Sequence, residues 1–241
     1  MFILNKSTNI NFNEWLNLCN SEGSAVLINK NPNWTSFDVV AKIRNITKIK
    51  KVGHCGTLDP FATGLLILCL GKATKQIDTF QNLPKQYTTT IKLGSTTKSF
   101  DIEQPEENSC SISHLKENEI IDTINSFKGV IKQIPPMFSA KKVKGKKLYE
   151  LARKDIEIDL QPAEVEIYNI EINKIELPFV TITIDCSKGT YIRALARDIG
   201  NKLGVGGYLT QLMRTKIGEY NVNEAYTIDE INLMKENIVV I

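Results

Sequence analysis

Residues 53–64 read GHCGTLDPFATG, and this short segment decides how the rest of the sequence is interpreted. Its three glycines let the backbone turn sharply and approach a ligand closely, and Pro60 stiffens the chain directly after an acid. A charged Asp59 on a rigid loop, near His54, is well placed to act on a bound molecule. The residue pattern alone, however, also suits a structural interpretation. Asp-Pro is a common turn, Asp59 could be a helix N-cap, and His54 could be a hydrogen-bonded loop histidine.

The elements around this loop follow from hydrophobic periodicity. Apolar residues recur at helical spacing over 36–49, with Ser36 as the expected N-cap, which predicts an amphipathic helix. After the loop, 65–70 is a continuous apolar run of the length of a buried strand, and 25–28 is a shorter one.

Further along the chain, the predicted elements include two strands and two helices. Residues 87–93 and 180–186 alternate apolar and polar, which is typical of strands with one buried face. Residues 192–203 have helical spacing, and a capping box at Thr227 opens a last helix. Because strands and helices do not alternate strictly, we expect an α+β fold with a central, mainly antiparallel β-sheet flanked by helices and loops.

Composition limits the class of protein. A chain of 241 residues with 42% hydrophobic residues can bury a large core, and we expect residues 1–23 to form a loosely structured extension of it. The five cysteines are scattered and include no C-x-x-C pair, so they suggest neither disulfides nor a zinc site, and a reducing compartment fits best. The N-terminus lacks a signal-peptide core, and the longest apolar run falls far short of the ~20 residues of a membrane span. We therefore expect a cytoplasmic protein.

Positive charge is concentrated in two stretches, although the net charge is only +3. Residues 141–154 hold seven basic side chains and one acid, and residues 42–51 hold five basic side chains and no acid. Such stretches suit a phosphate backbone, and they are also common as solvated faces.

A second candidate for chemistry is SKGTYIR at 187–193. An arginine at a strand-to-helix junction can pair with a carboxylate and lower its pKa, so Arg193 is a candidate partner for an acid, although structural ion pairs are common. Tyr87 heads a predicted strand, where a tyrosine is more often a core residue than a catalytic one.

Taken in order, these segments resemble the bacterial tRNA pseudouridine-55 synthase family (the TruB family) over about residues 24–230. The pattern G-H-x-G-T-L-D-P-x-A-T-G is the most specific element. Two further patterns, S-A-x-K-x-x-G-x-x-x-Y-x-x-A-R from Ser139 and S-K-G-T-Y-I-R from Ser187, follow at matching distances. The resemblance implies a pseudouridine synthase catalytic domain over 24–241 that flips the T-loop uridine 55 of tRNA out of its stack and isomerises it to pseudouridine.

The resemblance also assigns roles to residues of this sequence. It implies that Asp59 is the nucleophile, that Arg193 is its partner, and that Tyr87 stacks on the target base and moves a proton. The residues that it places at the substrate are His54, Tyr87, Tyr191 and Leu212. It implies no metal and no cofactor, the T-arm stem-loop of tRNA as partner, no membrane and no obligatory protein partner, and a monomer.

Many members of this family continue into a C-terminal PUA domain, whereas this chain ends soon after the helix at Thr227. We therefore expect no complete PUA domain and weaker tRNA affinity, with residues 141–154 making up part of the loss.

Three other interpretations remain open at this point. A guide-RNA-dependent pseudouridine synthase has similar catalytic segments but depends on a PUA domain and partner proteins. An RNA-folding or tRNA-chaperone module would use the same basic surface without needing a charged Asp59. A metal-dependent hydrolase would need His54, Asp59 and His114, which lack the spacing of metal ligands.

Overall fold

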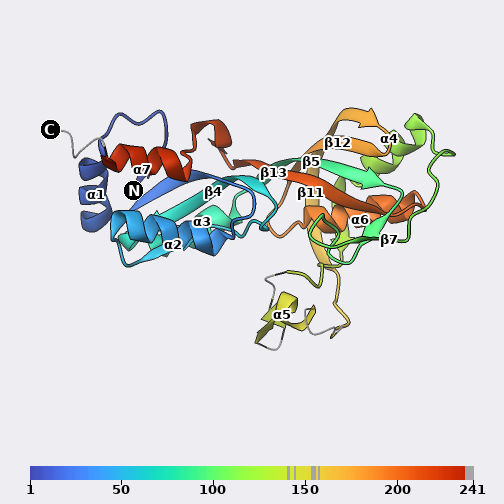
Figure 1. The fold of residues 1–241 in the computed structure, drawn as a ribbon, viewed down its shortest axis with the longest axis horizontal. Helices are drawn as coiled ribbons and strands as arrows, with labels where there is room; N and C mark the ends of the chain where they lie inside the picture. Colours follow the sequence, from blue (N-terminus) through green and yellow to red (C-terminus); the bar gives the residue numbers. More distant parts are fainter. Residues whose placement is uncertain (140–141, 144, 153–155, 157, 237–241) are drawn as a thin grey trace. The chain divides into compact units, whose positions relative to one another are not determined.

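The computed structural model describes residues 1–139, 142–143, 145–152, 156 and 158–236 (Figure 1). It divides into two compact units: the first unit is Met1–Gln86 with the chain from Met213, and the second unit is Tyr87–Leu212. Helices and strands are mixed without strict alternation, so the predicted α+β fold is confirmed.

The first unit is a small sheet covered by helices. Its strands follow the order β1-β2-β4-β13, with β3 beside β4 and β14 beside β13. The strands β2 and β3 pair antiparallel with β4, whereas β1 with β2 and β13 with β4 are parallel pairs. The elements of this unit are β1 (Phe2–Leu4), α1 (Phe12–Ser21), β2 (Ser24–Lys30), α2 (Ser36–Thr47), β3 (Val52–His54), β4 (Thr63–Leu70), η1 (Gly71–Gln76), α3 (Ile77–Asn82), β14 (Tyr220–Asn221), η2 (Val222–Glu224) and α7 (Ile228–Glu236), and it shares β5 (Lys85–Leu93) and β13 (Gly207–Ile217) with the second unit.

The predicted buried strand at 65–70 is confirmed as β4, whose residues from Leu65 to Leu70 are all 0% exposed. It is apolar throughout, rather than alternating, because both of its faces are covered. One face packs with Ala25 and Leu27 of β2 and with Phe80 of α3.

Helix α2 confirms the helix predicted at 36–49, but its N-cap is Thr35 and not Ser36. The Thr35 hydroxyl accepts a hydrogen bond from the Asp38 N–H (3.1 Å), and the Asp38 carboxylate accepts one from the Thr35 N–H (2.8 Å). The Ser36 hydroxyl is turned inward, where it accepts a hydrogen bond from the Leu58 N–H (2.9 Å). The cap therefore moves by one residue because Ser36 is used to hold the loop before β4.

The expectation of a loose extension over residues 1–23 is wrong. Strand β1 pairs with β2, with Phe2 opposite Ser24, and α1 begins with a capping box at Asn11. Trp15 of α1 is 0% exposed, and its indole N–H donates to the Ser24 hydroxyl (3.0 Å). These residues belong to the core of the first unit, while the proposed domain boundary at residue 24 stays a prediction.

The second unit is built on the strand order β13-β5-β12-β11-β8, in which β11 pairs antiparallel with both of its neighbours. The predicted strands at 87–93 and 180–186 and the predicted helix at 192–203 are confirmed as β5, β12 and α6. Among the helices that the structure describes, none is long and apolar enough to cross a membrane. The further elements are β6 (Thr96–Thr97), β7 (Glu106–Glu107), α4 (Glu117–Asn125), β8 (Gly129–Gln133), β9 (Lys142–Val143), β10 (Lys146–Lys147), α5 (Leu148–Ala152), β11 (Ala163–Glu176), β12 (Phe179–Cys186) and α6 (Ile192–Lys202).

Candidate active site

The loop that carries Asp59 joins β3 to β4, and it is shorter than the sequence suggests because His54 already belongs to β3. Asp59 is half-buried. Gly64, which ends the motif, has a φ of +100°, and a Cβ atom there would lie 2.3 Å from the Arg214 carbonyl oxygen. Only glycine allows this close approach of β4 to β13, so the last glycine of the motif is needed for the strand pairing behind the loop.

Lys30, at the end of β2, fixes the part of the loop that directly follows Asp59. Its side chain is fully buried, and its ammonium donates to the carbonyls of Asn31 (3.0 Å), Trp34 (2.7 Å) and Pro60 (3.1 Å). Because Pro60 directly follows Asp59, this buried charge limits where the Asp59 backbone can move.

Arg214 of β13 fixes the part of the same loop that precedes Asp59. It is 1% exposed, and its guanidinium donates to the carbonyls of Gly56 (3.2 Å), Thr57 (3.4 Å) and Leu65 (2.7 Å). Sequence reasoning missed this residue because it did not predict β13. A single arginine among the apolar residues of 207–217 was the available signal.

We expect Arg214→Met to lower the free energy of unfolding by about 3 kcal/mol, because it leaves buried carbonyls without donors. Lys216→Gln, an exposed change on the same strand, is the control and should have little effect. Urea denaturation measures both. Equal stability of the two variants would show that Arg214 does not hold the loop.

His54 lies against an aromatic side chain of α2. The Phe37 ring meets the His54 ring edge to face, with 5.3 Å between the centroids and 89° between the planes. Burial lowers the pKa of His54 below its usual value, the positive charge of Arg214 lowers it further, and a hydrogen bond with the Gly56 backbone opposes the shift. His54 is therefore neutral at neutral pH.

This shift predicts how stability depends on pH. The unfolded chain binds a proton at His54 near pH ~6.5, and the folded protein binds it only at lower pH, so stability falls as pH drops through about 6.5. We expect His54→Gln to lose less stability than the wild type between about pH 7.5 and 5.5. Thermal unfolding across this range measures the difference, and parallel curves for the two proteins would contradict the assignment.

In the second unit, Arg193 forms a buried ion pair with Asp101. Arg193 is 3% exposed and Asp101 is 0% exposed, and Nη1 of the arginine lies 3.3 Å from Oδ2 of the aspartate. The guanidinium also donates to the carbonyls of Ser99 (3.0 Å) and Phe138 (2.7 Å). Asp101 accepts further hydrogen bonds at Oδ1 from the Ser99 hydroxyl and the Glu103 N–H. The arginine head group is thus fixed in one orientation.

Tyr191 and Arg193 are brought together at the start of α6, where Tyr191 is the N-cap. The side chain of Gln133 clamps the Tyr191 backbone: its oxygen accepts from the Tyr191 N–H (2.8 Å), and its nitrogen donates to the Tyr191 carbonyl (3.1 Å). Tyr87 is half-buried in β5, and Leu212 is buried in β13.

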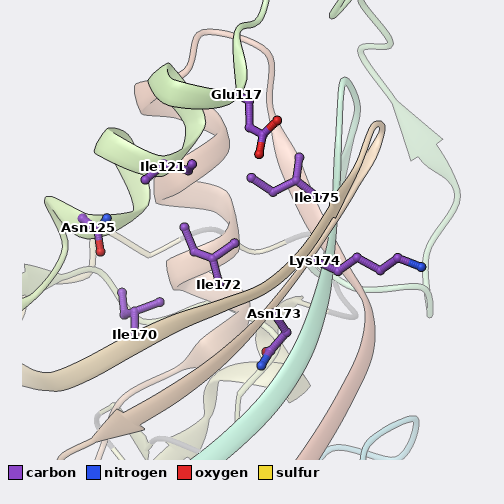
Figure 2. A pocket seen from close by; sticks show the side chains of 8 residues that line it. All are labelled: Glu117, Ile121, Asn125, Ile170, Ile172, Asn173, Lys174 and Ile175. Carbon is purple, nitrogen blue, oxygen red and sulfur yellow. The ribbon is translucent and has the colours of Figure 1, made fainter.

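Two pockets are lined by described residues of the second unit. The smaller one, of about 370 Å³, lies between α4 and β11 and contains no candidate site residue; Figure 2 shows Ile121 of α4 and Ile172 of β11 within it. The larger one, of about 910 Å³, is lined in part by Lys98, Phe138 and Arg197. It borders the Arg193 site, because the Phe138 carbonyl accepts a hydrogen bond from Arg193.

The basic stretch 141–154 is described in part: Lys142 belongs to β9, Lys146 and Lys147 form β10, and Lys141, Lys144, Arg153 and Lys154 lie outside the described residues. Within the described part of the chain, no group of three or more His, Cys, Asp or Glu side chains is arranged to hold a metal ion, and His114 is exposed.

Comparison with known families gives matches along most of the chain. Residues 44–192 match the family described as TruB family pseudouridylate synthase (N terminal domain), and residues 193–237 match the tRNA pseudouridylate synthase B C-terminal domain. A curated protein from Clostridium tetani, named tRNA pseudouridine synthase B, is 50% identical over 87% of this chain and 72% of its own. One of the same name from Chloroherpeton thalassium is 49% identical over 90% of this chain and 92% of its own.

Solved structures show the same fold. A Cbf5-Nop10-Gar1 complex matches with a TM-score of 0.70 and 27% identity, covering 96% of this chain and 61% of that chain. An archaeal box H/ACA sRNP Nop10-Cbf5 complex matches with a TM-score of 0.65 and 25% identity, covering 90% of this chain and 54% of that chain. This chain therefore spans less than two thirds of the length of either matched chain.

Proposed function

Because this chain belongs to the TruB family of pseudouridylate synthases, we propose that it isomerises uridine 55 in the T-loop of tRNA to pseudouridine. The observation that carries this proposal is the motif loop at residues 53–64, in which buried side chains hold the backbone on both sides of Asp59. A loop fixed in advance suits a nucleophile that must meet one atom of a large substrate.

The substrate has to change shape before it can react. A uridine inside the T-loop stack must be flipped out, at a cost of a few kcal/mol. A flat aromatic face recovers roughly 1 to 3 kcal/mol per base by stacking, and we assign this role to Tyr87, with His54, Tyr191 and Leu212 as further contacts of the substrate.

The reaction breaks the N1–C1′ glycosidic bond, turns the uracil and forms a C5–C1′ bond, after which C5 loses its proton and N1 carries one. The product is an isomer of the substrate and no electrons enter or leave, so no redox cofactor is required. One ionised carboxylate is the minimum equipment, and Asp59 is our nucleophile. Attack at C1′, attack at C6 and elimination through a glycal all remain open routes, and Tyr87 is the group assigned to relay the proton at C2′ or C5.

Arg193 is the proposed partner that keeps Asp59 charged and aimed. What supports this role is that its guanidinium is already held by Asp101 and by two backbone carbonyls, so it loses no further freedom when it acts. We further propose that the enzyme works as a cytoplasmic monomer on the T-arm, without an obligatory protein partner.

The test uses an unmodified tRNA transcript with tritium at C5 of its uridines. Forming the C5–C1′ bond releases that tritium into water, so the wild-type protein should release about one equivalent per tRNA in the presence of EDTA. If the protein binds this tRNA and releases none, the enzymatic proposal fails and the chaperone interpretation takes its place.

A further inference from the structure

One side of α2 faces solvent with an unusual set of side chains. Phe37 is 67% exposed, although a large aromatic ring is normally buried. Arg44 and Lys48 are also exposed, and they follow Phe37 at seven and eleven positions, which places all three on one face of a helix. At ~1.5 Å rise per residue, this α2 stripe (Phe37, Arg44, Lys48) is about 16 Å long.

The charge along the α2 stripe is not compensated by described residues. Neither Arg44 nor Lys48 forms an ion pair with a described carboxylate, and the Lys48 ammonium donates only to the Asn45 side chain (2.9 Å). The five basic residues of 42–51 have no acid among them, and Lys50 and Lys51 extend the same charge beyond the helix. The surface is therefore complementary to a run of negative charges.

The stripe begins beside the candidate active site of the first unit. Phe37 contacts His54 in a T-shaped arrangement, and it is nevertheless 67% exposed, so much of its ring surface faces solvent. The Asp38 carboxylate, which is the nearest acid along the helix, accepts hydrogen bonds from the Thr35 N–H and hydroxyl. An aromatic face next to a line of cations is the arrangement that binds unpaired nucleotides, with stacking for the base and ion pairs for the phosphates.

We propose that the α2 stripe is an RNA-binding site in which an unpaired nucleobase stacks on Phe37 and the following phosphates lie along Arg44 and Lys48. This inference rests on the proposed function, which identifies the bound RNA as the tRNA substrate. It adds a nucleobase site, distinct from the target uridine, that begins at the motif loop and runs along α2.

RNA affinity is measured with the full-length Asp59→Asn protein, so that the RNA is not modified during the measurement. Adding Phe37→Leu, which keeps an apolar side chain but removes the aromatic face, should weaken binding of a T-arm hairpin about tenfold, the lower part of the range for one stacked base. Adding Phe37→Trp should retain it. The matched control is Leu233→Ala, which removes an exposed apolar side chain of α7.

The charged part of the stripe is tested through salt. Arg44→Gln with Lys48→Asn should reduce the slope of log Kd against log salt concentration by about 1.4 to 1.8, the loss of two phosphate contacts. Asparagine suits position 48 because its φ is +59°. Lys128→Gln with Lys235→Gln removes the same charge from two other exposed positions and should change the slope little.

A fluorescent base separates direct stacking from an indirect effect through His54. Hairpins that carry 2-aminopurine at single unpaired positions should show one position whose fluorescence is quenched by the Phe37 protein and not by the Phe37→Leu protein. Unchanged affinity, slope and quenching in these variants would overturn the site. If tritium release is normal in that case, the proposed function stands alone; if release is absent while binding depends on Phe37, the enzymatic proposal fails and the RNA site stands.

Discussion

Replacing Asp59 by Asn is expected to reduce the single-turnover rate of pseudouridine formation by roughly 10⁴-fold or more, the scale seen when a nucleophile is removed. The amide is nearly isosteric with the carboxylate but is a poor nucleophile, so the loop should keep its shape while the reaction stops. Tritium release from the labelled tRNA measures the rate, and filter binding should give the same Kd as the wild type.

Asp78→Asn is the matched control, because Asp78 is an exposed aspartate of α3 in the same unit. It should leave the rate and the Kd unchanged. If the Asp59→Asn protein still converts its substrate, another residue is the nucleophile. If it loses binding together with turnover, Asp59 has a structural role in the loop that our account does not include.

The second large effect is expected at the buried ion pair of the second unit. Arg193→Met should lower the free energy of unfolding by about 3–5 kcal/mol, because it removes the arginine that pairs with the fully buried Asp101 carboxylate. Denaturation in urea measures this loss. Turnover should fall as well, because the side chain proposed to keep Asp59 charged is removed.

The double variant Arg193→Met with Asp101→Leu separates these two effects. It removes both charges, so it should recover part of the stability without recovering turnover. Lys174→Gln is the control for an ordinary ion pair, since Lys174 and Glu176 are both more than half exposed, and it should cost less than about 1 kcal/mol. Full stability of the Arg193→Met single variant would contradict the importance of the buried pair.

The sequence predicted the elements whose periodicity is strong. The structure contains the helix predicted over 36–49, the buried strand at 65–70 and the strand at 180–186. Each has a regular pattern of apolar residues that indicates which of its faces are buried. The motif loop was also identified, since its glycines and proline mark a turn whatever the surrounding fold is.

Strand β13 was missed because its pattern is broken by a charge. Arg214 occupies a buried position in it, and an isolated sequence gives no reason to bury a guanidinium. The reason lies in the carbonyls of Gly56 and Leu65, which are brought to it only when β13 pairs with β4. The pairing of strands that are far apart in the sequence cannot be derived from the hydrophobic periodicity of one segment.

Helix α1 was missed for a different reason, since its signals were present. Asn11 and Glu14 form a capping box, and Trp15 and Cys19 lie on one helical face. Three asparagines in the segment, Asn13, Asn17 and Asn20, have low helix propensity and hid this pattern. The ion pair of Arg193 with Asp101 was not predicted, because the two residues are far apart in the sequence and meet only through the tertiary structure.

The central claim is that this protein converts one particular uridine of tRNA. The most direct measurement is a nucleotide-resolution chemical map of pseudouridine in a tRNA transcript after incubation with the full-length protein, beside a transcript in which uridine 55 is replaced by cytidine. We predict a single modified position at uridine 55 in the first transcript and none in the second. Modification at other positions in both transcripts, or no modification in either while the protein binds them, would contradict the account.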